Sequence, residues 1–232
     1  MPFGIGSESD TLPIGSPAGE LSSWAPASAG HANQTDNARP KPTVKVRVYN
    51  YENVSPATLT EAEQVVGNIF HLHGVKLAWF DCARNAAELR QYPACEQAGG
   101  GAMTLALKIL PRSMARRYSM PMDIFGFALP AGKDGFAAYA NVFFHRAEEL
   151  AERKEAVGRK HYPSLAVILG HVMAHELGHL LLGWHHRPTG IMTAQWKGRQ
   201  LSEMAQRKFG FTSREGELLR GGIMQRARVA LR

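Results

Sequence analysis

The sequence has no apolar run long enough to cross a membrane as a helix. A membrane span needs about 18 or more apolar residues, whereas the apolar run at residues 164–173 is shorter and leads into histidines and a glutamate. The first residues also lack a basic region followed by an apolar core, so we expect no signal peptide in the chain as given. We therefore expect a protein without a membrane span.

The sequence also lacks internal repeats, a recognised nucleic-acid-binding module and a phosphate-binding glycine motif. Its net charge is +7 and its pI is near 9.6, but the basic residues are scattered along the chain. The glycines at 99–101 have neither G-x-G-x-x-G spacing nor a following helix pattern. Nucleic-acid binding would rest on net charge alone, so we expect a solvated basic surface and no nucleic-acid partner.

Cysteine is scarce, because the chain contains only Cys82 and Cys95, separated by a polar connection. A disulfide that closes a loop of this size stabilises a protein by about 3 kcal/mol in an oxidising compartment. No further ligand stands beside the two cysteines at metal-site spacing. We rank a disulfide first and free thiols second.

The sequence does contain enough apolar residues for one sizeable domain. Its 232 residues are 44% hydrophobic. Residues 1–40 are rich in small and polar residues and proline and show no apolar periodicity, which is typical of a disordered tail. We expect a disordered N-terminal tail over residues 1–40 and one domain over residues 41–232.

The periodicity after residue 40 predicts a strand–helix–strand unit, then more strands, then helices. The first helix begins at Ser55-Pro56, ends before Gly74 and carries an apolar stripe. A final helix begins near Thr212 and Glu215, which form a capping-box pattern. A charged helix is expected at 147–157. The expected strands are residues 43–49, 75–80, 103–109, 124–129 and 136–144.

The stretch from His171 to Gly183, H-V-M-A-H-E-L-G-H-L-L-L-G, reads as a buried helix that carries ionisable residues. His175 and His179 are four apart, so both imidazoles project from one face, about 6 Å apart along the axis. Two such imidazoles can hold one zinc ion, and Glu176 can reach a water on the metal, as in the H-E-x-x-H zinc hydrolases. Burying three ionisable groups in an apolar helix would cost free energy unless they served a common site. We predict zinc ligands at His175 and His179 and a general base at Glu176.

This stretch resembles the metzincin family of zinc metallopeptidases, whose pattern is H-E-x-x-H-x-x-G-x-x-H followed by a Met-turn. The resemblance is close over residues 168–196 and points to a small matrixin-like domain of bacterial type or an archaemetzincin-like domain. Gly190-Ile191-Met192 is similar to the Met-turn, which implies that Met192 lies under the metal site.

The resemblance implies a third histidine ligand, for which the sequence offers two candidates. His185 stands at the family's spacing from His179, but Leu182 occupies the family's glycine position. Gly183 comes one residue later, and the same count from it reaches His186. Because glycine readily takes the left-handed conformation that ends a helix, we favour His186, with His185 as the alternative.

His171 lies four residues before His175 on the same helix face. It is about 12 Å from His179 along the axis, so these two cannot bind one ion. We expect His171 to be a core residue or to support a ligand.

The resemblance implies an α+β, zincin-like fold. This fold has a mixed twisted sheet of about five strands, an early helix, the H-E-x-x-H helix and a small helical C-terminal part. In the family, an edge strand before the active-site helix pairs with an extended peptide. The strand expected in that role is residues 136–144.

Together these features predict a zinc-dependent endopeptidase that acts on a peptide or protein. Zinc lowers the pKa of a bound water towards about 7, and Glu176 takes a proton from that water and passes it to the leaving amine. The alternative is a non-catalytic zinc-containing domain that binds a peptide or partner, against which Glu176 argues. Substrate preference, oligomeric state and compartment stay open, although the cysteine pair and the resemblance favour a secreted or periplasmic location.

Overall fold

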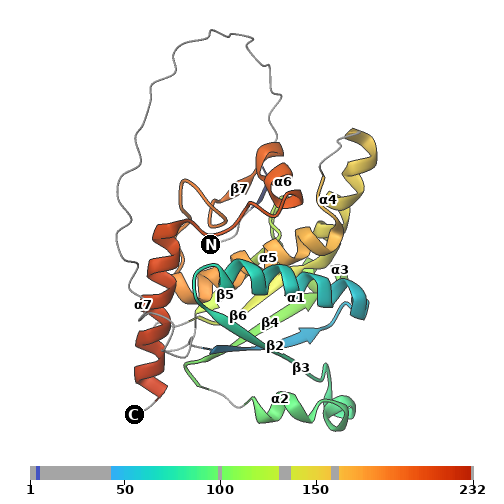
Figure 1. Ribbon diagram of the computed structural model, residues 1–232. Helices are drawn as coiled ribbons and strands as arrows, with labels where there is room; N and C mark the ends of the chain where they lie inside the picture. Colours follow the sequence, from blue (N-terminus) through green and yellow to red (C-terminus); the bar gives the residue numbers. More distant parts are fainter. Residues whose placement is uncertain (1–3, 6–42, 99–100, 131–136, 158–161, 231–232) are drawn as a thin grey trace, which may run out of the picture.

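The structure, a computed structural model, describes residues 4–5, 43–98, 101–130, 137–157 and 162–230 (Figure 1). A five-stranded sheet forms one layer, and the long helices α1 (Pro56–His71) and α5 (Leu165–Leu182) form a second layer on one of its faces. The predicted α+β class, with a mixed sheet of five strands, an early helix and a helical C-terminal part, is confirmed.

The sheet has the strand order β3-β2-β4-β6-β5. Strands β3, β2, β4 and β6 are parallel to one another, and β5 runs antiparallel to β6. Each strand overlaps one expected from the periodicity. The strands are β2 (Thr43–Asn50), β3 (Lys76–Asp81), β4 (Thr104–Leu110), β5 (Gly126–Pro130) and β6 (Ala137–Phe143).

The expectation that residues 136–144 form the edge strand is wrong. Strand β6 pairs with β4 on one side and with β5 on the other, so it is internal, and β5 is the edge strand. The alternation of residues within a strand reports which face is buried but not which strands become neighbours. Residues 131–136, between β5 and β6, lie outside the described residues.

The core lies between the sheet and the two long helices. In β2 the valines are buried and the intervening side chains are partly exposed, as period-two alternation predicts. Helix α1 begins as expected: Ser55 accepts a hydrogen bond from the Thr58 N–H at 3.2 Å, and Pro56 occupies the first helical position. The largest completely buried side chains include Phe70, Leu105, Leu107, Ile109, Ile168, Leu169 and Leu177.

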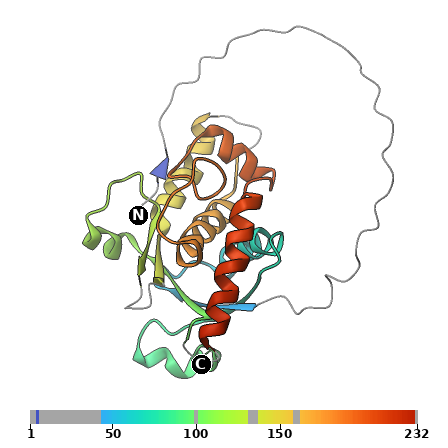
Figure 2. The same cartoon turned by 90° about the vertical axis from the view of Figure 1, so that its left-hand side faces the viewer.

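The remaining helices surround these layers. Helix α7 runs down one side of the molecule, across the helical layer and the sheet (Figures 1 and 2). Arg226 ties it to the domain by donating to the carbonyl oxygens of Ala102, at 3.0 Å, and Leu180. The helices are η2 (Ala86–Gln91), α2 (Pro93–Gln97), α3 (Arg112–Ala115), η3 (Arg116–Tyr118), α4 (Phe144–Val157), α6 (Gly198–Ala205) and α7 (Ser213–Ala230).

The chain that enters β5 is held by a buried arginine of α4. Arg146 donates to the carbonyl oxygens of Met120, at 3.1 Å, and Ile124, and its guanidinium lies 4.6 Å from the centroid of the Phe143 ring. A second cluster of buried apolar residues, which includes Phe127, packs here. These contacts fix the start of the edge strand.

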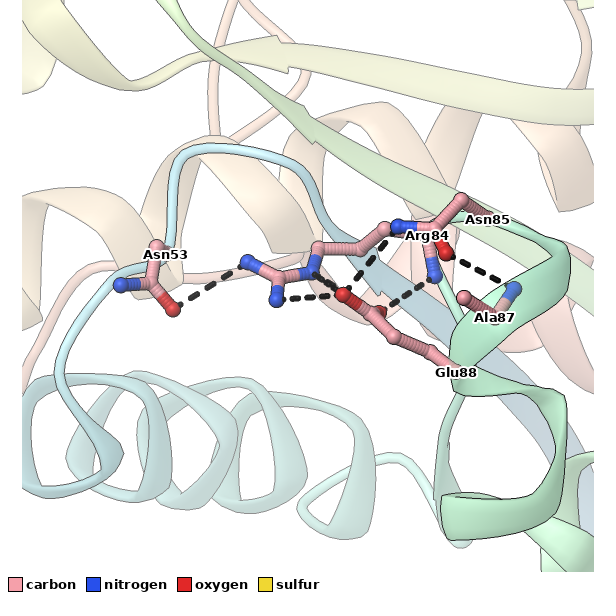
Figure 3. Close-up of polar contacts among 5 residues, drawn as sticks. All are labelled: Asn53, Arg84, Asn85, Ala87 and Glu88. Atoms are coloured by element: carbon pink, nitrogen blue, oxygen red, sulfur yellow. Dashed lines mark hydrogen bonds and ion pairs between the residues drawn. The ribbon is translucent and has the colours of Figure 1, made fainter.

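The polar connection from β3 to η2 and α2 is held by a disulfide and an ion pair. Cys82 and Cys95 form the disulfide predicted as the first alternative, with Cα atoms 5.1 Å apart. Arg84 Nη2 lies 2.6 Å from Glu88 Oε1, and Arg84 Nη1 donates to Asn53 Oδ1 at 3.3 Å (Figure 3). The connection is thus joined both to itself and to the start of α1.

A short strand, β1 (Gly4–Ile5), pairs in parallel with β7 (Gln195–Trp196). Gly4 and Ile5 lie within the predicted disordered tail, so for these two residues the structure differs from that expectation. Residues 1–3 and 6–40 of the predicted tail lie outside the described residues.

By length and composition alone, α5 could cross a membrane, because its 18 residues have a mean hydropathy of 1.5. The expectation that the apolar run is too short was therefore wrong, because the helix continues through the histidines to Leu182. However, 89% of that stretch is buried within the protein. The sheet and α1 provide the apolar surroundings, so α5 is the core helix of this domain.

Candidate metal centre

Helix α5 supplies the scaffold of the site. Ser164 caps it by accepting a hydrogen bond from the Val167 N–H at 3.3 Å, and the helix ends at Leu182. Gly183 follows with φ +88° and ψ −175°. The predicted buried helix is present, but the expectation of a left-handed conformation at Gly183 is wrong. The observed conformation is an extended one at positive φ, which is essentially restricted to glycine.

Three imidazoles converge at the C-terminal half of α5. His175, His179 and His186 each offer a ring nitrogen, and these atoms lie within 4.8 Å of one another. His175 and His179 are buried and His186 is half-buried. His185 is exposed and is not part of the group. The structure therefore brings together the favoured set of histidines and leaves out the alternative.

Backbone carbonyls orient two of the rings. His175 Nδ1 lies 2.6 Å from the Ile191 oxygen, and His179 Nδ1 lies 3.0 Å from the Gly183 oxygen. A carbonyl oxygen can only accept, so each Nδ1 carries the proton and each Nε2 presents its lone pair to the centre. His179 Nε2 faces His186 Nε2 at 3.3 Å.

Burial keeps these rings neutral. It lowers the pKa of His175 well below its usual value, with a further contribution from His179, and it lowers the pKa of His179 to about 4. The pKa of His186 is also lowered by burial. Neutral imidazoles are the form in which histidine binds a metal.

The Glu176 carboxylate completes the site. It is fully buried, and neither oxygen has a hydrogen-bond partner among the residues that the structure describes. Burial raises its pKa well above the usual value. The carboxylate lies against the backbone of β5, because a Cβ atom at Gly126 would stand 2.8 Å from Glu176 Oε1.

These residues suit a bound cation. An orphaned buried carboxylate is costly, and three converging neutral nitrogen donors would supply coordination that a divalent metal needs. The group is therefore able to hold a metal ion.

Met192 packs against α5 at Gly178. It is fully buried, and a Cβ atom at Gly178 would stand only 2.5 Å from Met192 Sδ. The sulfur therefore occupies the space that the missing side chain leaves.

Backbone hydrogen bonds hold the segment after α5 in place. The Arg187 N–H donates to the Met192 oxygen at 2.8 Å, and the Ile191 N–H donates to the Gly210 oxygen at 2.8 Å.

Gly190 has φ +77°, and a Cβ atom there would stand 2.7 Å from Glu215 Oε2. The same carboxylate oxygen accepts from the Thr212 N–H at 2.6 Å, which confirms the predicted capping box at the start of α7.

His171 is a buried core residue outside the histidine group. Its Nδ1 lies 2.7 Å from the Val167 oxygen and its Nε2 lies 3.2 Å from the Phe209 oxygen. It thereby joins α5 to the segment before α7. The expectation that His171 is a core residue is therefore confirmed.

Two contributors to the site were not identified from the sequence. Trp196 Nε1 donates to the Ile191 oxygen at 3.3 Å, the same oxygen that accepts from His175. Gly126 provides the backbone against which Glu176 lies. Gly126 carries no local sequence signal, because its contact with Glu176 joins segments far apart in the chain. The Trp196 hydrogen bond lies within one short segment, whose fold is set by packing against α5.

No family model matches the sequence, and no curated protein matches it. Among solved structures, the crystal structure of archaemetzincin from Methanopyrus kandleri is similar to this chain, with 16% sequence identity and a TM-score of 0.44. The match covers 81% of this chain and 99% of that one. The case for a function therefore rests on this chain's own side chains.

Proposed function

We propose that this protein is a zinc-dependent endopeptidase. One observation supports the proposal above the others: three imidazole nitrogens lie within 4.8 Å of one another, and Glu176, next in sequence to His175, is a buried carboxylate without a hydrogen-bond partner among the described residues. A structural metal site needs only its ligands. In a catalytic site, by contrast, a buried carboxylate next to a ligand can accept and deliver a proton.

His175, His179 and His186 would hold the ion. When bound, zinc supplies a Lewis acid that polarises a carbonyl and acidifies a water. Glu176 would accept the proton of the attacking water at a carboxylate oxygen and deliver it to the nitrogen of the leaving amine.

The substrate in this proposal is an extended peptide lying along β5. Strand β5 is the edge strand, and Glu176 lies against its first residue, Gly126. A peptide that pairs with this edge would pass beside the carboxylate and the histidines. This assignment replaces the earlier expectation for residues 136–144.

Glu176→Gln tests the proposal. The amide keeps the size of the side chain but cannot act as a general base, so the variant should retain metal and fold while losing hydrolysis of a diverse peptide library. The matched control is Glu203→Gln, on the partly exposed surface of α6, which should cleave like the wild type.

Two outcomes would contradict the endopeptidase proposal. Cleavage by Glu176→Gln at the wild-type rate would remove Glu176 from the reaction. A metal-loaded wild type that binds peptides but cleaves none would favour the non-catalytic zinc-containing domain.

A further inference from the structure

A cavity lies outside the histidine group. Its volume is about 320 Å³, and it is formed by α1, the first turns of α5 and the segment from the end of α6 to residue 211. None of the three converging histidines lines it. The volume is at the lower end of the range found for small-molecule sites, about 300–1,000 Å³.

The walls of the cavity are largely apolar and include Val65, Ile69, Leu72, Val167, Phe209 and Phe211. Leu72 is 79% exposed, so an apolar surface continues from the cavity to the solvent. Such walls favour a ligand with an apolar body.

The two imidazoles that line the cavity are already hydrogen-bonded to backbone carbonyls. His73 Nε2 lies 3.1 Å from the Phe211 oxygen, and both nitrogens of His171 face carbonyl oxygens. Their ring faces extend the apolar wall. They leave the recognition of a polar ligand group to other side chains.

Four polar side chains that line the cavity are free to bind a ligand. Among the described residues, the side chains of Glu61, Gln64, Asn68 and Arg207 make no hydrogen bond or ion pair. Gln64 and Asn68 stand four apart on α1, so their amides share one face of the helix. The charged lining residues are two cations, Arg207 and Lys208, and one carboxylate, Glu61.

We propose that this cavity binds a small carboxylate with an apolar body, such as a medium-chain fatty acid. The apolar part lies against the walls from α1, α5 and the phenylalanines. The carboxylate accepts hydrogen bonds from the Arg207 guanidinium, whose planar donors match two carboxylate oxygens, and from the amides of Gln64 and Asn68.

The backbone at Arg207 allows a clean test. After α6 the Arg207 N–H donates to the Met204 oxygen and the Lys208 N–H donates to the Glu203 oxygen, both at 2.9 Å. Arg207 has φ +57°, and this pattern of helix end usually carries glycine at that position. Arg207→Gly therefore removes the cation and suits the backbone, so a loss of binding cannot be attributed to misfolding.

The probe is octanoate, titrated calorimetrically into the full-length, zinc-loaded protein, with octylamine as the probe of opposite charge. We expect saturable octanoate binding at one site per chain and much weaker binding of octylamine. Arg207→Gly should weaken octanoate binding by about tenfold or more, the effect of losing hydrogen bonds to a charged group. Leu72→Asp should also weaken it, because it adds a negative charge at the rim. The control Arg199→Gln, on α6 but outside the cavity, should bind as the wild type does.

Binding of octanoate at the metal centre gives a different pattern. It would persist in Arg207→Gly and disappear when zinc is removed by a chelator, and this result would overturn the proposal. Equal affinity for octanoate and octylamine, or no binding of octanoate by the wild type, would overturn it as well.

Discussion

Gly126 and Glu176 are in direct contact across the domain. The carboxylate of the buried helix lies so close to the edge strand that a Cβ atom on Gly126 would stand 2.8 Å from Glu176 Oε1 and 2.6 Å from the Asn141 backbone oxygen. The absence of a side chain at Gly126 thus sets the position of the proposed base relative to the strand along which a peptide is proposed to lie.

Gly126→Ala should therefore displace Glu176 and lower peptide hydrolysis by about tenfold or more, since small misplacements of reacting groups are costly. Stability should also fall, by about 1–3 kcal/mol, the usual cost of overpacking. Steady-state kinetics and thermal melts, each with zinc content measured, test both effects. Gly67→Ala is the matched control: a Cβ atom there meets nothing within 4 Å, and alanine suits the helix α1, so stability should be equal or higher. Full activity of Gly126→Ala would show that this contact does not position the base.

His186→Ala should weaken zinc affinity by about a hundredfold or more, beyond the 10–100-fold typical of losing a residue that only supports a ligand. His185→Ala should have little effect, because His185 is exposed and outside the converging group. Competition titrations with a zinc chelator measure both affinities. A larger loss in His185→Ala would return the third position to the family's spacing.

Glu63→Gln should change the pH dependence of stability. Burial, with a further contribution from Asp81, raises the pKa of Glu63 from 4.5 to about 7. The folded state thus holds a proton that the unfolded state has released, so the stabilisation is fully present below about pH 4.5 and is lost as the pH rises through about 7. The melting temperature of Glu63→Gln relative to the wild type should therefore be higher at about pH 8 than at about pH 5. Glu61→Gln, at an exposed position of the same helix, is the control. A difference that does not change with pH would contradict the shift.

Loss of the disulfide between Cys82 and Cys95 should lower the free energy of unfolding by about 3 kcal/mol. The double variant Cys82→Ala/Cys95→Ala, melted beside the wild type with and without a reductant, measures this loss. Reductant should lower the wild-type melting temperature towards that of the variant and leave the variant unchanged. Zinc content should stay the same in both proteins, because the bridge lies outside the metal centre. Equal melting temperatures under all conditions would show that the bridge adds no stability.

The features that the sequence determined by itself are those carried by neighbouring residues. The helix from residue 165 to 182 follows from its apolar run, from the Ser164 cap and from Gly183. Each of these signals involves only residues within or next to the helix. The shared face of His175 and His179 follows from the helical repeat, and the Thr212–Glu215 capping box from a three-residue spacing. Each of these features is local, so no knowledge of the remaining chain was needed.

Tertiary structure decided which distant segments meet. It made β5 the edge strand, because strand order depends on pairing partners and not on alternation within a strand. It brought His186 into the histidine group through a return of the chain held by hydrogen bonds to Met192 and Gly210. It also placed Gly126 against Glu176, and Arg207 beside α1. Contacts of this kind arise from packing between elements far apart in sequence, so residue spacing alone does not predict them.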